Sequence, residues 1–193
     1  MEHFYTIQGE GSNTGRAAYF IRLGGCDVGC VWCDVKESWD IEPHPKMTLD
    51  EILEEVLEFG AKLCVITGGE PALFNLEPLT ALLRNNGIET AIETSGTREL
   101  TGKWDTVCFS PKKFKLPVES IYKQANELKV IVYHPSDLQW ADEHAEKVNS
   151  NCLLYLQPEW SREEEMLPII IDHVKRSPRW RISLQTHKYM NIP

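Results

Sequence analysis

The feature that most limits the possible folds is a regular alternation of short apolar runs with amphipathic stretches along the 193 residues. The runs are rich in Val, Ile and Leu, and such strands alternating with helices predict parallel pairing under a cover of helices. We expect an α/β fold in one domain, residues 1–193, built as an incomplete (β/α) barrel of mostly parallel strands. Functional residues should lie at the carboxyl ends of its strands. The expected strands are 18–23, 63–67, 89–93, 106–110, 128–133, 153–157 and 181–185.

Helix starts are indicated by two capping-box sequences, in which Ser or Thr is followed three residues later by Glu. Thr48 and Glu51 predict a helix that runs to about Phe59. Ser161 and Glu164 form the same signature ahead of a second expected helix, residues 166–174. The other expected helices are 76–84, 118–126 and 138–148.

The composition limits the partners. The net charge of −9 is unlike that of proteins with a clustered basic face, so neither nucleic acid nor a membrane is expected as a partner. No apolar run approaches the ~20 residues of a transmembrane helix, and the opening residues lack a signal-peptide pattern. We therefore expect a cytoplasmic protein, in which six cysteines serve as metal ligands or buried thiols rather than as disulfides.

The strongest local signal is a loop in which Cys26, Cys30 and Cys33 follow Gly24 and Gly25. The spacing fits neither a helix nor a strand, so the three thiols do not share the core face of one element. A loop containing glycines can instead turn all three sulfurs toward one metal centre. Three thiolates leave one iron of a [4Fe–4S] cluster without a protein ligand, and an open coordination position is typical of a reactive metal site.

The spacing alone also permits a zinc site, with Asp34 or His44 as a fourth ligand, in a non-enzymatic zinc-binding module. A disulfide is disfavoured by the expected compartment. Cys64, Cys108 and Cys152 each lie in an apolar run and are interpreted as small buried hydrophobic residues.

The Cys-x-x-x-Cys-x-x-Cys spacing, with Trp32 directly before the last cysteine, resembles the signature of the radical S-adenosylmethionine (SAM) superfamily. Residues 67–71, Thr-Gly-Gly-Glu-Pro, are similar to the superfamily's GGEP motif, whose backbone holds the amino group of SAM. Glycine permits such a close backbone approach. A simple strand-to-helix turn would explain the glycines and the proline, but not their pairing with the cysteine loop. The resemblance implies a [4Fe–4S] cluster on Cys26, Cys30 and Cys33.

Further segments, in the same order over nearly the whole chain, resemble the 7-carboxy-7-deazaguanine synthase family. They are 5–11 (YTIQGEG), 93–96 (ETSG), 110–112 (SPK) and 184–189 (LQTHKY). That family converts 6-carboxy-5,6,7,8-tetrahydropterin to 7-carboxy-7-deazaguanine with loss of ammonia, on the route to the tRNA nucleoside queuosine. The resemblance implies such a lyase, acting as a homodimer and reduced by a donor such as flavodoxin.

The resemblance also implies the residues that contact the pterin. The carboxylate of Glu10 can accept two N–H bonds from an aminopyrimidine ring. Arg22 can hold the substrate carboxylate in a bidentate pair, and its place in an otherwise apolar strand requires an anion nearby. The implied pterin contacts are Ile7, Gln8, Gly9, Glu10, Arg22, Thr67, His187 and Pro193.

For SAM, the resemblance implies contacts from several segments, with Glu93 and Ser95 beside either its ribose or the pterin. No side chain is assigned as the hydrogen abstractor, because in this family the 5′-deoxyadenosyl radical derived from SAM takes hydrogen from C6 of the pterin. The implied SAM contacts are Trp32, Asp34, Gly69, Glu93, Ser95, Ser110, Pro111, Lys112, Gln157, Pro158, Glu159 and Trp160.

One position departs from the family. Two residues after the last cluster cysteine the family often has Thr or Ser, whose oxygen binds a Mg²⁺ ion that bridges to the substrate carboxylate. This chain has Val35 there. Magnesium prefers oxygen ligands and retains waters. We expect either that Mg²⁺ is held through substrate, water and Asp34, or that the ion is dispensable.

A different small radical SAM enzyme, such as an activase that makes a glycyl radical on a partner protein, is the nearest alternative. The two functions differ in their requirements. A pterin-dependent enzyme cleaves SAM with the pterin present and without a protein partner, whereas an activase needs its partner.

Overall fold

The computed structural model describes residues 1–42 and 44–193, and it contains one eight-stranded sheet whose strands follow each other in chain order. The first two strands are antiparallel, and every later neighbouring pair is parallel. The strands are β1 (Glu2–Ile7), β2 (Ala17–Leu23), β3 (Leu63–Gly68), β4 (Glu89–Thr94), β5 (Thr106–Phe109), β6 (Glu127–Val132), β7 (Leu153–Pro158) and β8 (Trp180–Ile182).

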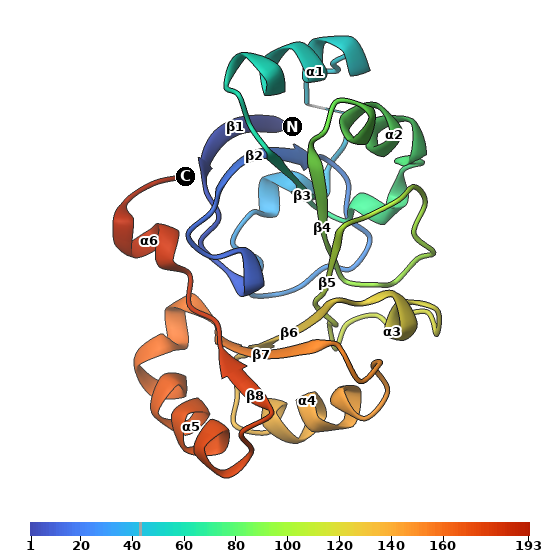
Figure 1. The fold of residues 1–193 in the computed structure, drawn as a ribbon. Coiled ribbons are helices and arrows are strands. Elements are labelled where there is room, and N and C mark those ends of the chain that lie inside the picture. Colours follow the sequence, from blue (N-terminus) through green and yellow to red (C-terminus); the bar gives the residue numbers. More distant parts are fainter. Residues whose placement is uncertain (43) are drawn as a thin grey trace.

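The sheet curves into a barrel that stays open. Within the described residues, β1 pairs only with β2 and β8 only with β7. Helices surround the outside of the curve, and the last helix lies at the gap between β1 and β8 (Figure 1). The helices are α1 (Leu49–Glu58), α2 (Glu77–Asn85), α3 (Ile121–Gln124), α4 (Asp137–Ala145), α5 (Glu163–Arg176) and α6 (Thr186–Met190). The expected incomplete (β/α) barrel is confirmed.

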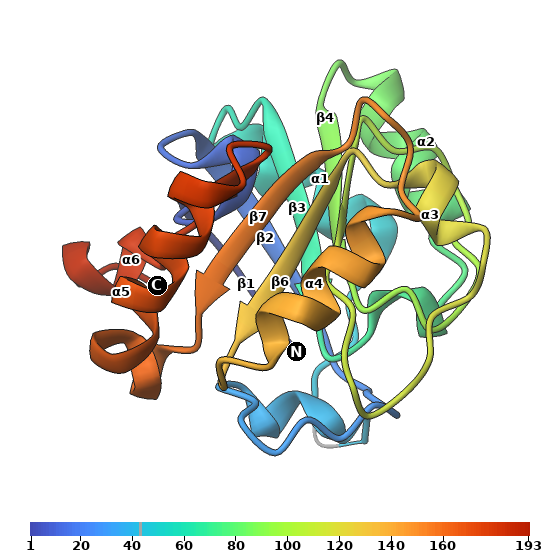
Figure 2. The ribbon, with the colours of Figure 1, turned by 90° about the horizontal axis from the view of Figure 1, so that it is seen from below.

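The main hydrophobic core lies between the sheet and its helices. Ile66, Ile92, Leu128 and Leu156 are fully buried there, on β3, β4, β6 and β7. Burying each such side chain stabilises the fold by about 1.5–3 kcal/mol. A second view shows α4 and α5 running alongside β6 and β7 (Figure 2). Because side chains alternate along a strand, the neighbours of these core residues point into the barrel.

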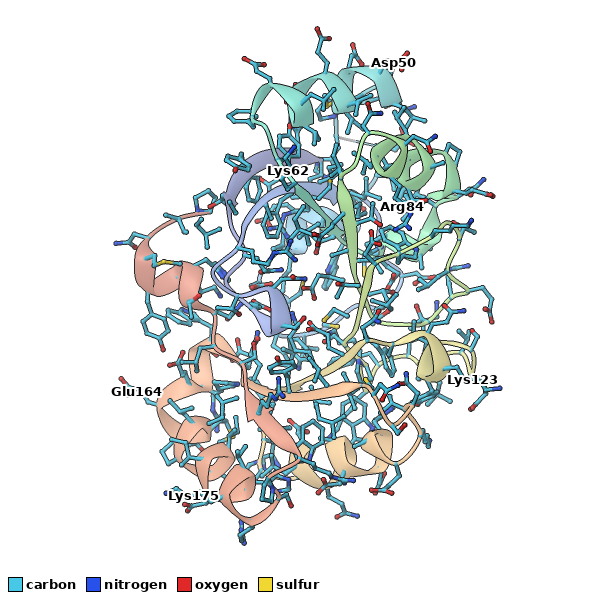
Figure 3. All side chains as sticks on the ribbon, in the orientation of Figure 1. Asp50, Lys62, Arg84, Lys123, Glu164 and Lys175 are labelled. Carbon is cyan, nitrogen blue, oxygen red and sulfur yellow. The ribbon has the colours of Figure 1, made fainter. Side chains whose placement is uncertain are left out.

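Charged residues make up 25% of the chain, and they lie mainly on the outside of the molecule. Charged side chains such as Asp50 on α1 and Lys175 on α5 lie on the periphery of the molecule (Figure 3). Among the helices that the structure describes, none combines the length and the apolar character that crossing a membrane would take.

Two expected elements are shorter in the structure. The helix expected over 118–126 is reduced to α3, because Val118 donates its N–H to the Gly96 carbonyl (2.8 Å) instead of entering a helix. The strand expected over 181–185 ends at Ile182. Both β1 and α6 were absent from the sequence-based prediction.

The two predicted capping boxes differ in outcome. At Thr48 the box is confirmed, since its hydroxyl accepts from the Glu51 N–H (3.3 Å) and its own N–H donates to the Glu51 carboxylate (2.7 Å). At Ser161 the prediction is wrong, because the serine hydroxyl donates to Glu159 (2.6 Å) and the start of α5 has no side-chain cap. Pro168 lies inside α5, where its missing N–H leaves one helical bond unmade without ending the helix.

Candidate active site

A cavity of about 270 Å³ lies inside the barrel, lined by the ends of β2, β3, β4 and β7, by β6, and by segments after β1, β5 and β8. Every predicted site residue lines it except Pro111, which lines a smaller neighbouring cavity. The predicted residues in the lining are Ile7, Gln8, Gly9, Glu10, Arg22, Cys26, Cys30, Trp32, Cys33, Asp34, Thr67, Gly69, Glu93, Ser95, Ser110, Lys112, Gln157, Pro158, Glu159, Trp160, His187 and Pro193.

The cysteine loop forms one side of the cavity. Its backbone is held by a bond from the Cys26 N–H to the Trp39 carbonyl (3.1 Å) and by a turn from Cys33 N–H to the Cys30 carbonyl (3.0 Å). All three cysteines are free thiols, and burial raises the pKa of Cys30 to about 11. Thiolates are the ligands of iron–sulfur clusters, so metal binding here must release the Cys30 proton. This donor set fits a cluster that keeps one iron open.

The Gly68–Gly69–Glu70 segment packs directly against the cysteine loop. The Gly69 N–H donates to the Leu23 carbonyl (2.9 Å), and the Glu70 N–H donates to the Gly25 carbonyl (2.7 Å). A Cβ added to Gly69 would lie 2.1 Å from the oxygen of Gly25, closer than real Cβ contacts. Glycine is therefore required because two backbones meet here.

Glu70 is a buried residue that was absent from the predicted site. Its carboxylate accepts bonds from the Thr94 hydroxyl (2.6 Å), the Ser95 N–H (2.8 Å) and the Ala72 N–H (3.0 Å). These bonds satisfy a carboxylate that is almost fully removed from water. Glu70 thus ties the end of β3 to the end of β4.

Three charged side chains form a buried cluster in the cavity wall. On β6, Nζ of Lys129 lies 2.5 Å from a Glu10 oxygen and 2.8 Å from a Glu93 oxygen. The Gln185 amide donates to the second oxygen of Glu10 (2.9 Å), and the Gln8 amide donates to Glu93 (3.4 Å). Lys129 was absent from the sequence-based prediction, although a lysine inside the apolar run of β6 indicates a buried charge.

The charged groups in this cluster shift one another's pKa values. Burial by itself would raise the pKa of Glu10, but Lys129 and the bond from Gln185 outweigh it and lower the pKa to about 2. Burial raises the pKa of Glu93 above its ordinary value, and the nearby Glu10 and Glu127 add to the effect. Burial would lower the pKa of Lys129, yet the surrounding carboxylates raise it well above its ordinary value. Lys129 is therefore a cation and Glu10 an anion at neutral pH.

One further cluster has the residue types of a metal site. Within the described residues, ligand atoms of Glu93, Cys108 and Glu127 lie within 4.8 Å of one another, on adjacent strands in register. The Lys129 ammonium pairs with Glu93, and the Ser12 N–H donates to Glu127 (2.8 Å). Because these bonds already engage both carboxylates, we assign no metal to this cluster.

Arg22 lies beside Thr67 and Glu2 in the sheet register. Its Nε is 2.6 Å from a Glu2 oxygen, although the angle between them makes no hydrogen bond. Glu2 thus supplies an anion beside this half-buried strand position. The Arg22 side chain, 20% exposed, also borders the cavity.

The lining after β5 carries a second lysine. Nζ of Lys112 donates to the Ser110 hydroxyl (2.6 Å) and lies 5.3 Å from the centroid of the Trp32 ring. Burial lowers the pKa of Lys112. These three residues therefore form one contact group between the cysteine loop and the end of β5.

The residues after β8 cross the open side of the barrel and border the cavity. Thr186 donates both its N–H (3.0 Å) and its hydroxyl (2.9 Å) to the carbonyl of Gly9. A Cβ on Gly9 would lie 2.3 Å from Nδ1 of His187, so glycine is needed where the two segments meet. Burial lowers the pKa of His187, and the Thr6 hydroxyl donates to the carbonyl of Pro193 (3.3 Å).

The same tail supports the end of β7. Gln157 accepts a bond from the Ser183 hydroxyl (2.7 Å), and the Trp160 ring meets that of Tyr189 edge-on, 5.4 Å between centroids. These contacts join two lining segments that are far apart in the sequence.

Asp34 and Val35 both line the cavity directly after the cysteine loop. An Asp34 oxygen lies 3.4 Å from Nζ of Lys188 and 3.5 Å from the Gln185 amide. The side chain of Val35 brings only carbon, so Asp34 is the oxygen ligand that this position can offer to a cation. His44, the other candidate for a fourth zinc ligand, instead places Nε2 2.9 Å from a backbone carbonyl oxygen.

A family model described as the radical SAM superfamily matches residues 20–131, which include the cysteine loop and the glycine motif. The fold and the cysteine-lined cavity agree with this match. They define the class of protein as a radical SAM enzyme, for which a [4Fe–4S] cluster and SAM are implied.

Relatives named 7-carboxy-7-deazaguanine synthase are similar over nearly the whole chain. The one from Flavobacterium psychrophilum is 56% identical, covering 100% of this chain and 91% of its own, and the one from Synechocystis sp. is 45% identical, covering 99% and 91%. A crystal structure of QueE from Escherichia coli matches with a TM-score of 0.81 at 34% identity, covering 95% of this chain and 91% of that chain. The chain belongs to the 7-carboxy-7-deazaguanine synthase family of radical SAM enzymes.

Proposed function

We propose that this chain converts 6-carboxy-5,6,7,8-tetrahydropterin to 7-carboxy-7-deazaguanine with loss of ammonia, for queuosine or another deazapurine. The observation that carries the proposal is the shared cavity. The three thiols of the cysteine loop, Arg22 and the segment after β1 all line it. The residues expected to bind a cluster, SAM and a small carboxylated ring therefore border one space.

The cofactors follow from the class and from the lining. When bound, a [4Fe–4S] cluster and SAM would supply one-electron reductive chemistry that starts a radical reaction. Cys26, Cys30 and Cys33 would hold the cluster. The backbone around Gly69 and the contact group of Lys112, Ser110 and Trp32 would hold SAM, together with Asp34, Glu93, Ser95 and residues 157–160.

The remaining polar groups position the pterin. Ionised Glu10 accepts N–H bonds from the aminopyrimidine ring, and Arg22 pairs with the substrate carboxylate beside Thr67. His187, with Pro193 and the rest of the tail, closes the open side of the barrel. This closure excludes water and oxygen from a reactive radical.

Arg22→Ala is expected to raise KM for the pterin about 10- to 150-fold, because a charge-assisted bond of about 1.5–3 kcal/mol is lost. Iron content and SAM binding should stay near wild type. Steady-state kinetics with varied pterin, beside iron analysis, measure both. Arg16→Ala removes a comparable but exposed ion pair with Glu89 and serves as the matched control. If Glu2→Ala raised KM as much as Arg22→Ala, the effect would belong to the Arg22–Glu2 pair rather than to the substrate.

The Mg²⁺ requirement is a separate prediction. Since Val35 offers no oxygen, we expect Val35→Thr to increase stimulation of turnover by added Mg²⁺, compared with the wild type after chelation. Full loss of wild-type turnover without the ion would exclude dispensability. It would leave Asp34, substrate and water as the ligands.

The partners and the compartment are part of the same proposal. We infer that residues 1–193 act as one radical SAM domain and that the protein is a cytoplasmic homodimer reduced by a donor such as flavodoxin. The free thiols support a reducing compartment, since iron–sulfur ligation needs free cysteines. The homodimer and the electron donor rest on the family relationship alone.

The experiment that tests the function uses anaerobically reconstituted protein with dithionite, SAM and 6-carboxytetrahydropterin, followed by mass spectrometry. Formation of 7-carboxy-7-deazaguanine is the expected result. Release of 5′-deoxyadenosine without the deazapurine would point to another small radical SAM enzyme. A colourless protein that leaves SAM intact would contradict the radical chemistry.

A further inference from the structure

Lys129 is a buried cation that no step of the proposed mechanism yet uses. Its side chain is 5% exposed and points into the barrel, where it lines the cavity between Glu10 and Glu93. A buried ion pair is weak evidence for stability, because well-packed apolar residues serve as well or better. Charged groups at the wall of a cavity are instead typical of a ligand-binding site.

The bonds of this cluster leave a defined set of groups free for a ligand. The Lys129 ammonium has three N–H donors, and its bonds to Glu10 and Glu93 use two of them. Each oxygen of Glu10 accepts one bond, from Lys129 or from Gln185, and each has a second acceptor position. Glu10 and Lys129 therefore offer two acceptors and a donor side by side.

This order of groups complements one edge of a pterin. The edge of a 2-amino-4-oxopyrimidine presents the 2-amino N–H, the ring N3–H and the C4 carbonyl, which are two donors and then an acceptor. If Glu10 accepts the two N–H groups, the carbonyl lies on one side of its carboxylate. Lys129, 2.5 Å from a Glu10 oxygen, is close enough to share that carbonyl.

Resting on the proposed function, we propose that Lys129 donates its third N–H to the C4 carbonyl of the substrate and thereby makes the site selective for 2-amino-4-oxopyrimidine rings. Glu93 and Gln8 hold the ammonium in place from the other side. A 2,4-diaminopyrimidine would instead bring an amino group against the ammonium. Two donors would then face each other in a buried site and leave both without an acceptor.

The test compares two stable compounds, pterin-6-carboxylate and 2,4-diaminopteridine-6-carboxylate. The first has a C4 carbonyl and an N3–H, and the second has a C4 amino group and an N3 without hydrogen, so the contact to Lys129 and one contact to Glu10 both change. Each compound is titrated by fluorescence into reconstituted enzyme with SAM bound. The wild type should bind the 4-oxo compound at least about 10- to 150-fold more tightly, since that is the factor expected for the charge-assisted bond from Lys129 alone. In Lys129→Met the ratio of the two affinities should fall about 10- to 150-fold, because the donor that binds the carbonyl and repels the amino group is gone. Any preference that remains comes from the N3–H bond to Glu10.

Matched variants separate recognition from folding. Lys113→Met removes a lysine that lines the smaller neighbouring cavity and pairs with Asp137, and it should leave the ratio unchanged. Lys129→Met with Glu93→Gln keeps the summed charge of the three-residue cluster at its wild-type value, so it protects the fold. Compared with Glu93→Gln alone, this double variant should show the same fall of about 10- to 150-fold in the ratio of the two affinities.

Three outcomes would overturn the proposal. The first is an equal loss of affinity for both compounds in Lys129→Met. That result would mean that Lys129 only positions Glu10 and does not contact the C4 carbonyl. The others are a wild type without preference, and a wild type that binds neither compound while turning over its substrate. A wild type that forms no 7-carboxy-7-deazaguanine would contradict the proposed function instead.

Discussion

Cys30→Ala is expected to abolish cluster assembly and to lower turnover by at least roughly 10³-fold, the scale of losing a reactive centre. Cys30 is buried in the cysteine loop, and two remaining thiolates cannot hold three irons of the cluster. Iron and sulfide analysis, the visible absorbance of the reconstituted protein and 5′-deoxyadenosine formation measure the loss.

The matched control is Cys152→Ala, which removes a buried thiol from an apolar site before β7. It should lower the free energy of unfolding by about 1 kcal/mol and leave the iron content unchanged. A Cys30→Ala protein with wild-type iron and turnover would refute the assignment of the cluster ligands.

Gly69→Ala should disrupt the site through the backbone rather than through a ligand. The added Cβ would lie 2.1 Å from the Gly25 oxygen and 2.7 Å from the Ser38 oxygen, and neither backbone atom can rotate away. We expect a loss of about 1–3 kcal/mol in the free energy of unfolding. SAM cleavage should fall by more than about tenfold, because the cysteine loop and the end of β3 can no longer pack together.

Denaturant unfolding and 5′-deoxyadenosine assays check the two effects separately. Gly87→Ala is the control, since its backbone φ of 72° strains an alanine while its surroundings are open. It should lower stability without a comparable effect on SAM cleavage. Normal SAM cleavage in Gly69→Ala would mean that the close approach has no bearing on the site.

The local patterns in the sequence were sufficient to predict most of the strands. Apolar runs located β2 to β7, because a parallel strand covered on both faces needs continuous hydrophobic residues. The edge strand β1 was missed, since its residues are largely half-exposed and carry no such run. Its strand conformation depends on pairing with β2, which local pattern does not show.

The same contrast between local and long-range interactions applies to the helix ends. The Thr48 capping box involves only residues three apart, so the sequence predicted it correctly. At Ser161 the identical pattern failed, because Glu159 competes for the hydroxyl. The expected helix at 118–126 shortened because its backbone bonds to a segment from another part of the chain.

For the site, the sequence by itself determined the cysteine spacing and the glycine motif, whose chemistry depends on residues close together in the chain. Only the tertiary structure decided that Lys129 meets Glu10 and Glu93, which are 119 and 36 residues away. The energy of a buried charge depends on which groups surround it and on how much water is removed. That environment exists only once the curved sheet has brought β4, β6 and the segment after β1 around one cavity.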